Sequence, residues 1–131
     1  NNVNVTTVIH DIILYKIPHS ITIPLIEKSI VSGTEPEKDT YAKLLLYIGE
    51  DALKTLKKLA QRGDLLTRAA GTLALITFGI NNARAYVNKF LKDFASQAAG
   101  AEHGIQSTYK WVKTKWEYIQ KLNNRTNFSG N

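Results

Sequence analysis

The chain contains a stretch of fifteen residues, Ala69–Ala83, without one charged side chain. Its large apolar residues project on every side of a helix: Leu73, Leu75, Ile76, Phe78 and Ile80. A helix that is apolar all round must be buried all round. The stretch is shorter than the roughly 20 residues that cross a bilayer, and its small residues, Ala69, Ala70, Gly71 and Ala74, permit close approach of a neighbouring backbone. The sequence therefore predicts a helix at the centre of a globular core.

A strongly amphipathic segment precedes this stretch. Thr34-Glu35-Pro36-Glu37 has the pattern of a capping box with Pro in the first turn. The apolar residues that follow recur at three- and four-residue spacings, which predicts one helix ending at Gly63. Gly49 would lie within that helix, and close packing of another helix against it would explain why a glycine stands there. Asp64 is placed to cap the next helix.

Further helical patterns occupy the rest of the chain. An apolar stripe predicts a helix over 5–17, and the two prolines of Pro18–Pro24 predict an extended stretch before a short helix ending near Ser32. A break is expected at 79–82, before an amphipathic helix that stops at Gly100. The last helix is expected over 101–122, with a tight apolar seam at Ile105, Tyr109, Val112, Trp116 and Ile119.

These patterns predict an all-α fold. The expected architecture is a compact single-domain bundle of four to six helices around the nearly uncharged 65–82 segment, spanning 1–131, with flexible tails at 1–7 and 123–131. A chain of 131 residues can bury such a core without a disulfide or metal staple.

Catalytic and metal-binding motifs are not evident. The sequence contains no Cys, and His10 and His103 stand beside acidic residues that would point away from them on a helix. His19-Ser20, between two prolines, is expected to be a loop rather than a site. We therefore expect no enzyme activity, no metal and no cofactor. Lysines spread over several helices argue against nucleic acid as a partner, and a membrane is not expected either.

The chain is expected to be secreted and extracellular. It contains no Met, which removal of an N-terminal secretion signal would explain, as would an artificially chosen start. Three glycosylation sequons begin at Asn4, Asn124 and Asn127. They are expected to lie outside the helices.

The net charge of +6 falls entirely in residues 65–131, because the charges of residues 1–64 balance. A positive field suits an acidic protein, a polyanion or a lipid surface, although it can also serve only solubility. On a helical wheel, Trp111 and Tyr118 fall outside the apolar seam of the last helix, with Lys110 and Lys115 nearby. Exposed aromatic residues among lysines are typical of a protein-binding surface. The alternative is that both aromatic residues belong to the core. The candidate binding residues are Trp111, Tyr118, Lys110 and Lys115, with electrostatic support from Lys54, Lys57 and Lys58.

The whole-chain plan resembles a family of small secreted salivary proteins of anopheline mosquitoes, the anophensin and albicin group. The resemblance rests on the segment 15–24 (YKIPHSITIP), the capped helix from Thr34 and the basic aromatic segment 109–116 (YKWVKTKW). It implies an inhibitor of host defence in blood. It also implies a plasma protein complex as partner: the C3 convertase of the alternative complement pathway, or factors of contact and kallikrein–kinin activation. No site residues are carried over from the family.

We therefore expect a non-enzymatic binding protein that blocks a host defence cascade, most readily the alternative complement pathway. Three alternatives stay open: inhibition of contact activation, carriage of a small hydrophobic ligand between the uncharged helix and its neighbours, and a membrane-lytic toxin.

Overall fold

A computed structural model describes residues 17–100 and 103–129 of the chain. These residues form six α-helices and one short 3-10 helix: α2 His19–Ser32, α3 Glu35–Ile48, η1 Glu50–Ala52, α4 Leu53–Leu59, α5 Leu65–Phe78, α6 Ile80–Ala99 and α7 His103–Ser129. The all-α bundle expected from the sequence is confirmed. The tail predicted at 1–7 and all but the last residue of the helix predicted over 5–17 lie outside the described residues.

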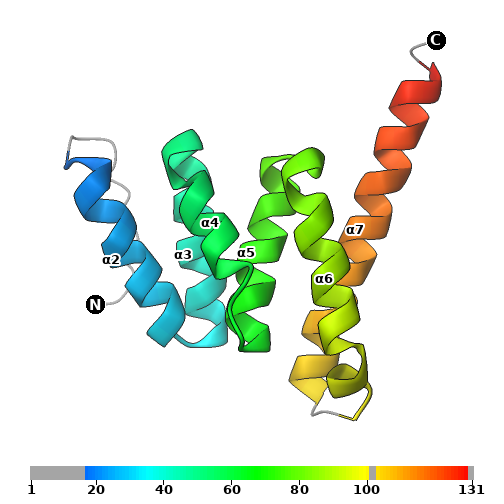
Figure 1. The fold of residues 1–131 in the computed structure, drawn as a ribbon, viewed down its shortest axis with the longest axis horizontal. Helices are drawn as coiled ribbons and strands as arrows, with labels where there is room; N and C mark the ends of the chain where they lie inside the picture. Colours follow the sequence, from blue (N-terminus) through cyan, green and yellow to red (C-terminus); the bar gives the residue numbers. More distant parts are fainter. Residues whose placement is uncertain (1–16, 101–102, 130–131) are drawn as a thin grey trace.

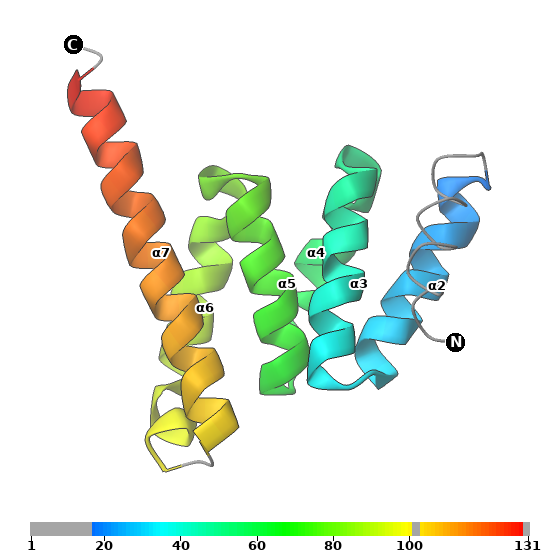
Figure 2. The same ribbon diagram turned by 180° about the vertical axis from the view of Figure 1, so that it is seen from behind.

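The helices alternate between two layers. Helices α2, α4 and α6 form the layer that faces the viewer in Figure 1, and α3, α5 and α7 form the layer seen from behind in Figure 2. Helix α5 packs against α3, α4, α6 and α7. Its Leu75 and Ala69 are almost fully buried. The uncharged helix is therefore the centre of the bundle, as its sequence indicates.

A close contact between backbones joins α5 to the end of α4. A Cβ atom on Gly71 would lie 2.6 Å from the backbone nitrogen of Ala60 and 2.8 Å from the carbonyl carbon of Leu59. Real Cβ atoms do not approach backbone atoms so closely, so a glycine is required here. This confirms the close approach predicted for the small residues of α5.

The extended stretch predicted for Pro18–Pro24 is wrong. Pro18 is the N-cap of α2, and Pro24 lies inside that helix. Pro24 cannot donate the backbone hydrogen bond that would reach back to Ser20, and a proline in a helix interior costs about 3 kcal/mol. Burial of Ile23, Ile26 and Ile30 on the inner face of α2 offsets this cost.

The single long helix predicted from Thr34 to Gly63 is interrupted. The capping box at Thr34 is confirmed, with the Thr34 amide donating to the Glu37 carboxylate at 2.7 Å. However, α3 ends at Ile48 and is followed by Gly49, whose φ of +87° lies in the left-handed region. Nothing approaches within 4 Å of the position of a Cβ at Gly49. The glycine therefore serves a turn into η1 and α4, and the close crossing predicted there is absent.

Helix α7 extends beyond the end expected at Leu122 and continues to Ser129. Its last turns project past the neighbouring helices α5 and α6 (Figure 2). Two of the sequons, at Asn124 and Asn127, consequently lie within a helix rather than outside one. The third, at Asn4, lies outside the described residues.

Candidate functional site

An exposed apolar strip runs along the outer side of α7. Trp111 is 57% exposed, Tyr118 is 60% exposed and Leu122 is 38% exposed. Spacings of seven and four residues place the three side chains on one side of the helix. On the inner side of the same helix, Val112 and Trp116 are buried. Of the two alternatives left open by the sequence, Trp111 and Tyr118 are therefore surface and not core. We call Trp111, Tyr118 and Leu122 the aromatic face.

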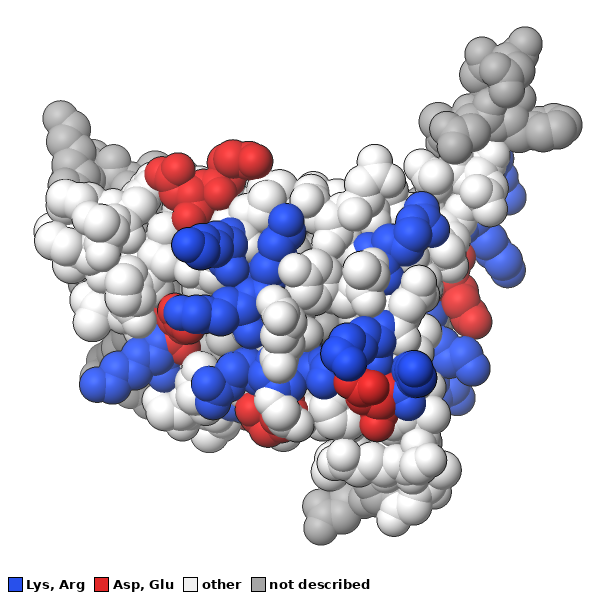
Figure 3. Space-filling model, viewed as in Figure 1, with Lys and Arg blue, Asp and Glu red and all other residues white. Residues whose placement is uncertain are grey.

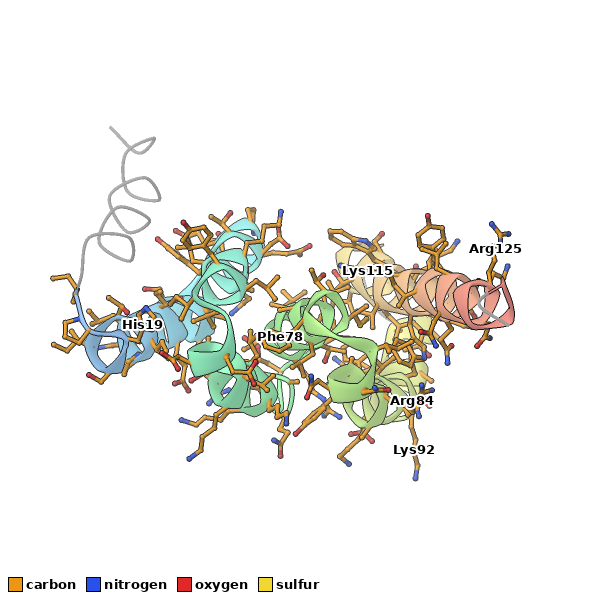
Figure 4. All side chains as sticks on the ribbon, turned by 90° about the horizontal axis from the view of Figure 1, so that it is seen from above. His19, Phe78, Arg84, Lys92, Lys115 and Arg125 are labelled. Carbon is orange, nitrogen blue, oxygen red and sulfur yellow. The ribbon has the colours of Figure 1, made fainter. Side chains whose placement is uncertain are left out.

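The lysines of α4 do not lie beside this aromatic face. Lys54, Lys57 and Lys58 line a groove formed with α2 and α6, in the opposite layer of the bundle. Figure 3 shows Lys and Arg side chains gathered over α4 and α6. Seen along the helices in Figure 4, Arg84 and Lys92 of α6 lie on this side and Lys115 of α7 lies on the other. The candidate residues predicted as one patch thus separate into two surfaces.

A shallow groove lies beside the aromatic face. Helix α5 forms its floor with Ala70 and Leu73, α3 forms one wall with Asp39, and α7 forms the other. Two small hollows in this groove have volumes of about 50 and 30 Å³; Lys115 lines the first and Trp111 the second. Small side chains on α5 also leave open space above this helix, between α3 and α7. The groove and the aromatic face together present α3, α5 and α7 as one continuous surface.

Lys115 is held in place at the rim of this groove. Its ammonium group donates to the Thr77 hydroxyl at 2.8 Å. Burial lowers the pKa of Lys115, the charge of Asp39 raises it, and the charge of Lys43 lowers it further. Lys43 itself pairs with Asp39 at 3.0 Å. A fixed, partly desolvated cation therefore lies between the two aromatic residues.

Lys110 lies on the other flank of α7. It lines a groove of about 580 Å³ between α6 and α7, together with Tyr109 and Glu117. Lys110 is exposed. Of the four residues predicted on α7, Trp111, Tyr118 and Lys115 share one side, and Lys110 borders that side without joining the α3–α5–α7 groove.

The residues predicted from the sequence for the binding surface did not include Leu122, Asp39 or Lys43. The seven-and-four spacing from Trp111 could have revealed Leu122, but the helix was expected to end there. Asp39 and Lys43 are four residues apart, a spacing typical of an ordinary ion pair on the solvent-exposed face of a helix. Their place in the groove depends on where α3 lies relative to α7, and the sequence pattern does not contain that information.

No cluster able to hold a metal ion, formed by three or more His, Cys, Asp or Glu side chains, occurs in residues 17–100 and 103–129. His19, expected in a loop, is the first residue of α2, and its Nδ1 lies 2.7 Å from the Asp51 carboxylate. This pair joins the start of α2 to η1. Within the part of the chain that the structure describes, no helix is both long and apolar enough to cross a membrane.

The chain matches no protein-family model, and no curated protein or solved structure shows significant similarity to it.

Proposed function

We propose that this protein is a secreted, non-enzymatic binding protein that inhibits a host defence cascade by occupying the surface of one of its complexes. The observation that carries the proposal is the aromatic face of α7. Trp and Tyr are enriched among the residues that contribute most to protein–protein binding, and large exposed apolar residues in a row mark such surfaces. Here they stand on a rigid helix beside the fixed cation of Lys115.

The mechanism requires no chemistry on the partner. A cascade that depends on assembly of a protein complex stops when a rigid protein covers the assembly surface. An interface of ordinary size buries about 800 Å² on each partner. The α3–α5–α7 surface offers an aromatic anchor, a groove and charges of both signs. The target favoured by the resemblance to the anopheline salivary family is the C3 convertase of the alternative complement pathway.

The first experiment measures lysis of rabbit erythrocytes by human serum in magnesium–EGTA buffer, with and without the protein. We expect protection at sub-micromolar concentration. Trp111→Ala should raise the concentration required roughly thirtyfold, because truncation of a central aromatic anchor typically costs about 2 kcal/mol of binding.

Leu25→Ala is the matched control for that variant. Leu25 is 62% exposed but belongs to α2, in the opposite layer. It should retain full protection, and both variants should keep the circular dichroism spectrum and melting temperature of the parent chain. Equal protection by Trp111→Ala and the parent would show that the aromatic face is not the binding surface. An absence of protection by the parent would remove the complement target, and inhibition of kallikrein generation in plasma would then be measured.

Carriage of a hydrophobic ligand beside α5 has less support. Two hollows that α5 lines hold about 50 and 30 Å³. Sites for small molecules usually have volumes of about 300–1,000 Å³.

A further inference from the structure

The groove between α2, α4 and α6 has the size of a ligand site and a concentration of positive charge. Its volume is about 570 Å³. Lys54, Lys57 and Lys58 of α4 line it from one side of that helix, so three lysines border one hollow. This groove lies in the layer opposite the aromatic face. It is therefore independent of the function proposed above.

Little of this charge is neutralised within the protein. Glu27 is the one carboxylate among the described residues that line the groove, and it pairs with Lys58 at 3.2 Å. Lys54 and Lys57 have no carboxylate within ion-pair distance among the described residues. The groove consequently keeps two uncompensated positive charges, which repel each other until an anion enters.

The positive surface continues from the groove across α6. Figure 3 shows basic side chains extending from α4 to α6 on this side of the molecule. Lys89 pairs with Asp93 at 3.4 Å, whereas Lys92 has no such partner in the described part of the chain. Figure 4 shows Lys92 projecting from α6 on this side, whereas the guanidinium of Arg84 lies over the Trp116 ring of α7, 5.7 Å from its centroid. A partner that follows this surface must therefore carry several negative charges in a row.

The neutral residues of the groove indicate the kind of polyanion. Tyr86, Gln61 and Thr55 place phenol, amide and hydroxyl groups beside the lysines, and the exposed Pro24 adds apolar surface. Hydroxyl, amide and phenol groups match the hydroxyls of sugars, and apolar surface matches the C–H faces of sugar rings. Lysine ammonium groups are compact, rotatable charges that suit isolated sulfate groups. We propose that this groove binds a sulfated polysaccharide.

Nucleic acid and membrane fit the same surface less well. Single-stranded nucleic acid is bound by several aromatic side chains on which successive bases stack, and Tyr86 is the one aromatic residue in the groove. A membrane needs apolar side chains beside the cations. Ile21 and Leu25 of α2 are exposed, but they lie roughly 110° and 150° around that helix from the mean direction of its groove residues.

The test is titration calorimetry of the full chain with a size-defined heparin oligosaccharide at several salt concentrations. We compare the parent chain with Lys54→Gln/Lys57→Gln and with Lys110→Gln/Lys121→Gln, which removes the same charge from exposed positions of α7. The α4 variant should bind roughly threefold to tenfold more weakly, since each exposed ion pair contributes little by itself. For this variant, the slope of log affinity against log salt concentration should become shallower by about one unit for each lysine removed. The α7 variant should retain the affinity of the parent.

The comparison ligands are desulfated heparin, duplex DNA of equal charge and phosphatidylserine vesicles. The proposal expects weak binding to all three. Equal losses in the two double variants would overturn it, because net charge alone would then explain binding. Tighter binding to DNA or to the vesicles would overturn it as well. Lys54→Gln/Lys57→Gln should still protect erythrocytes, and Trp111→Ala should still bind heparin, so the two proposals fail separately.

Discussion

The ammonium group of Lys38 lies inside the bundle, although its residue type favours the surface. It donates to the carbonyl oxygens of Ile30 and Val31 and to the hydroxyl of Thr67, at 2.9, 3.1 and 2.9 Å. The two carbonyls belong to the last turn of α2, whose free acceptors and partial negative charge attract a cation. A side chain of α3 thus completes the end of α2 and ties both helices to α5.

We expect Lys38→Met to lower the free energy of unfolding by about 1–3 kcal/mol, because it leaves buried acceptors without donors. Urea denaturation measures this change. Lys43→Met is the matched control on the same helix. The Lys43 ammonium is exposed, and Asp39 is its one ion-pair partner among the described residues, so its loss should cost well under 1 kcal/mol. Equal stability of the two variants would mean that the buried hydrogen bonds contribute nothing net.

Single residues could be predicted where their role is local. The caps at Thr34 and Asp64 follow from residues three positions away, and both are present. Lys38 could not be predicted, since its partner Thr67 stands 29 positions later. The same holds for Arg68, which is buried against the ring of Phe94 and pairs with Asp93 at 2.7 Å. Such contacts depend on which helices meet.

Replacement of Gly49 by alanine would have opposite effects on stability in an uninterrupted helix and in the turn that the structure shows. In an uninterrupted helix, replacing a glycine with alanine stabilises by about 1 kcal/mol. In the structure the same residue has a φ of +87° and open space around it. Gly49→Ala should therefore destabilise by about 1–3 kcal/mol through backbone strain alone.

Thermal unfolding followed by circular dichroism decides the sign of that change. Gly63→Ala is the control, because nothing lies within 4 Å of its Cβ position and its backbone is not in the left-handed region. It should leave the melting temperature unchanged or slightly raised. A stabilised Gly49→Ala would mean that α3 and α4 form one helix.

Helix ends were the less predictable property of the elements. The break at Gly79 was visible because Gly-Ile-Asn-Asn interrupts both neighbouring patterns. The start of α2 was not, since two prolines favour an extended chain locally and only the burial of Ile23, Ile26 and Ile30 overrides them. Polar composition similarly suggested a tail at 123–131, whereas the structure continues α7 to Ser129.

At the scale of the whole molecule, periodicity predicted the helices and the central position of α5, but not the layer of each helix. The lysines of α4 and the aromatic residues of α7 were therefore joined into one surface that the structure divides. A helical wheel shows whether a side chain lies outside an apolar seam, as it does for Trp111 and Tyr118. It does not show which other helix lies beside that side chain.

The bundle should lose stability in acid through the carboxylates at its helix starts. Burial raises the pKa of Asp64, but hydrogen bonds from Thr67 outweigh it and leave the pKa below its ordinary value of 3.8. A depressed pKa in the folded state means that the ionised group stabilises the fold above the ordinary pKa. This contribution is lost as pH falls through the folded pKa. Hydrogen bonds with Thr34 lower the pKa of Glu37 in the same sense.

Asp64→Asn tests this assignment, because Asn caps helices as well as Asp but does not titrate in this range. Between roughly pH 5 and pH 2, its melting temperature should fall less steeply than that of the parent. Glu50→Gln, which removes one exposed carboxylate from η1, controls for the change in net charge. Parallel pH profiles for the parent and Asp64→Asn would show that the cap does not contribute to acid unfolding.

The alternation of helices between two layers also determines how the chain reaches its fold. Every helix finds its main partners one or two elements away along the chain, so the loops that must close are short. The entropy of closing a loop rises with its length, and proteins whose contacts are local fold within microseconds to milliseconds. The central helix α5 is reached halfway along the chain and is the main partner of α4, so helices α2 to α5 can pack together before α6 and α7 complete the bundle.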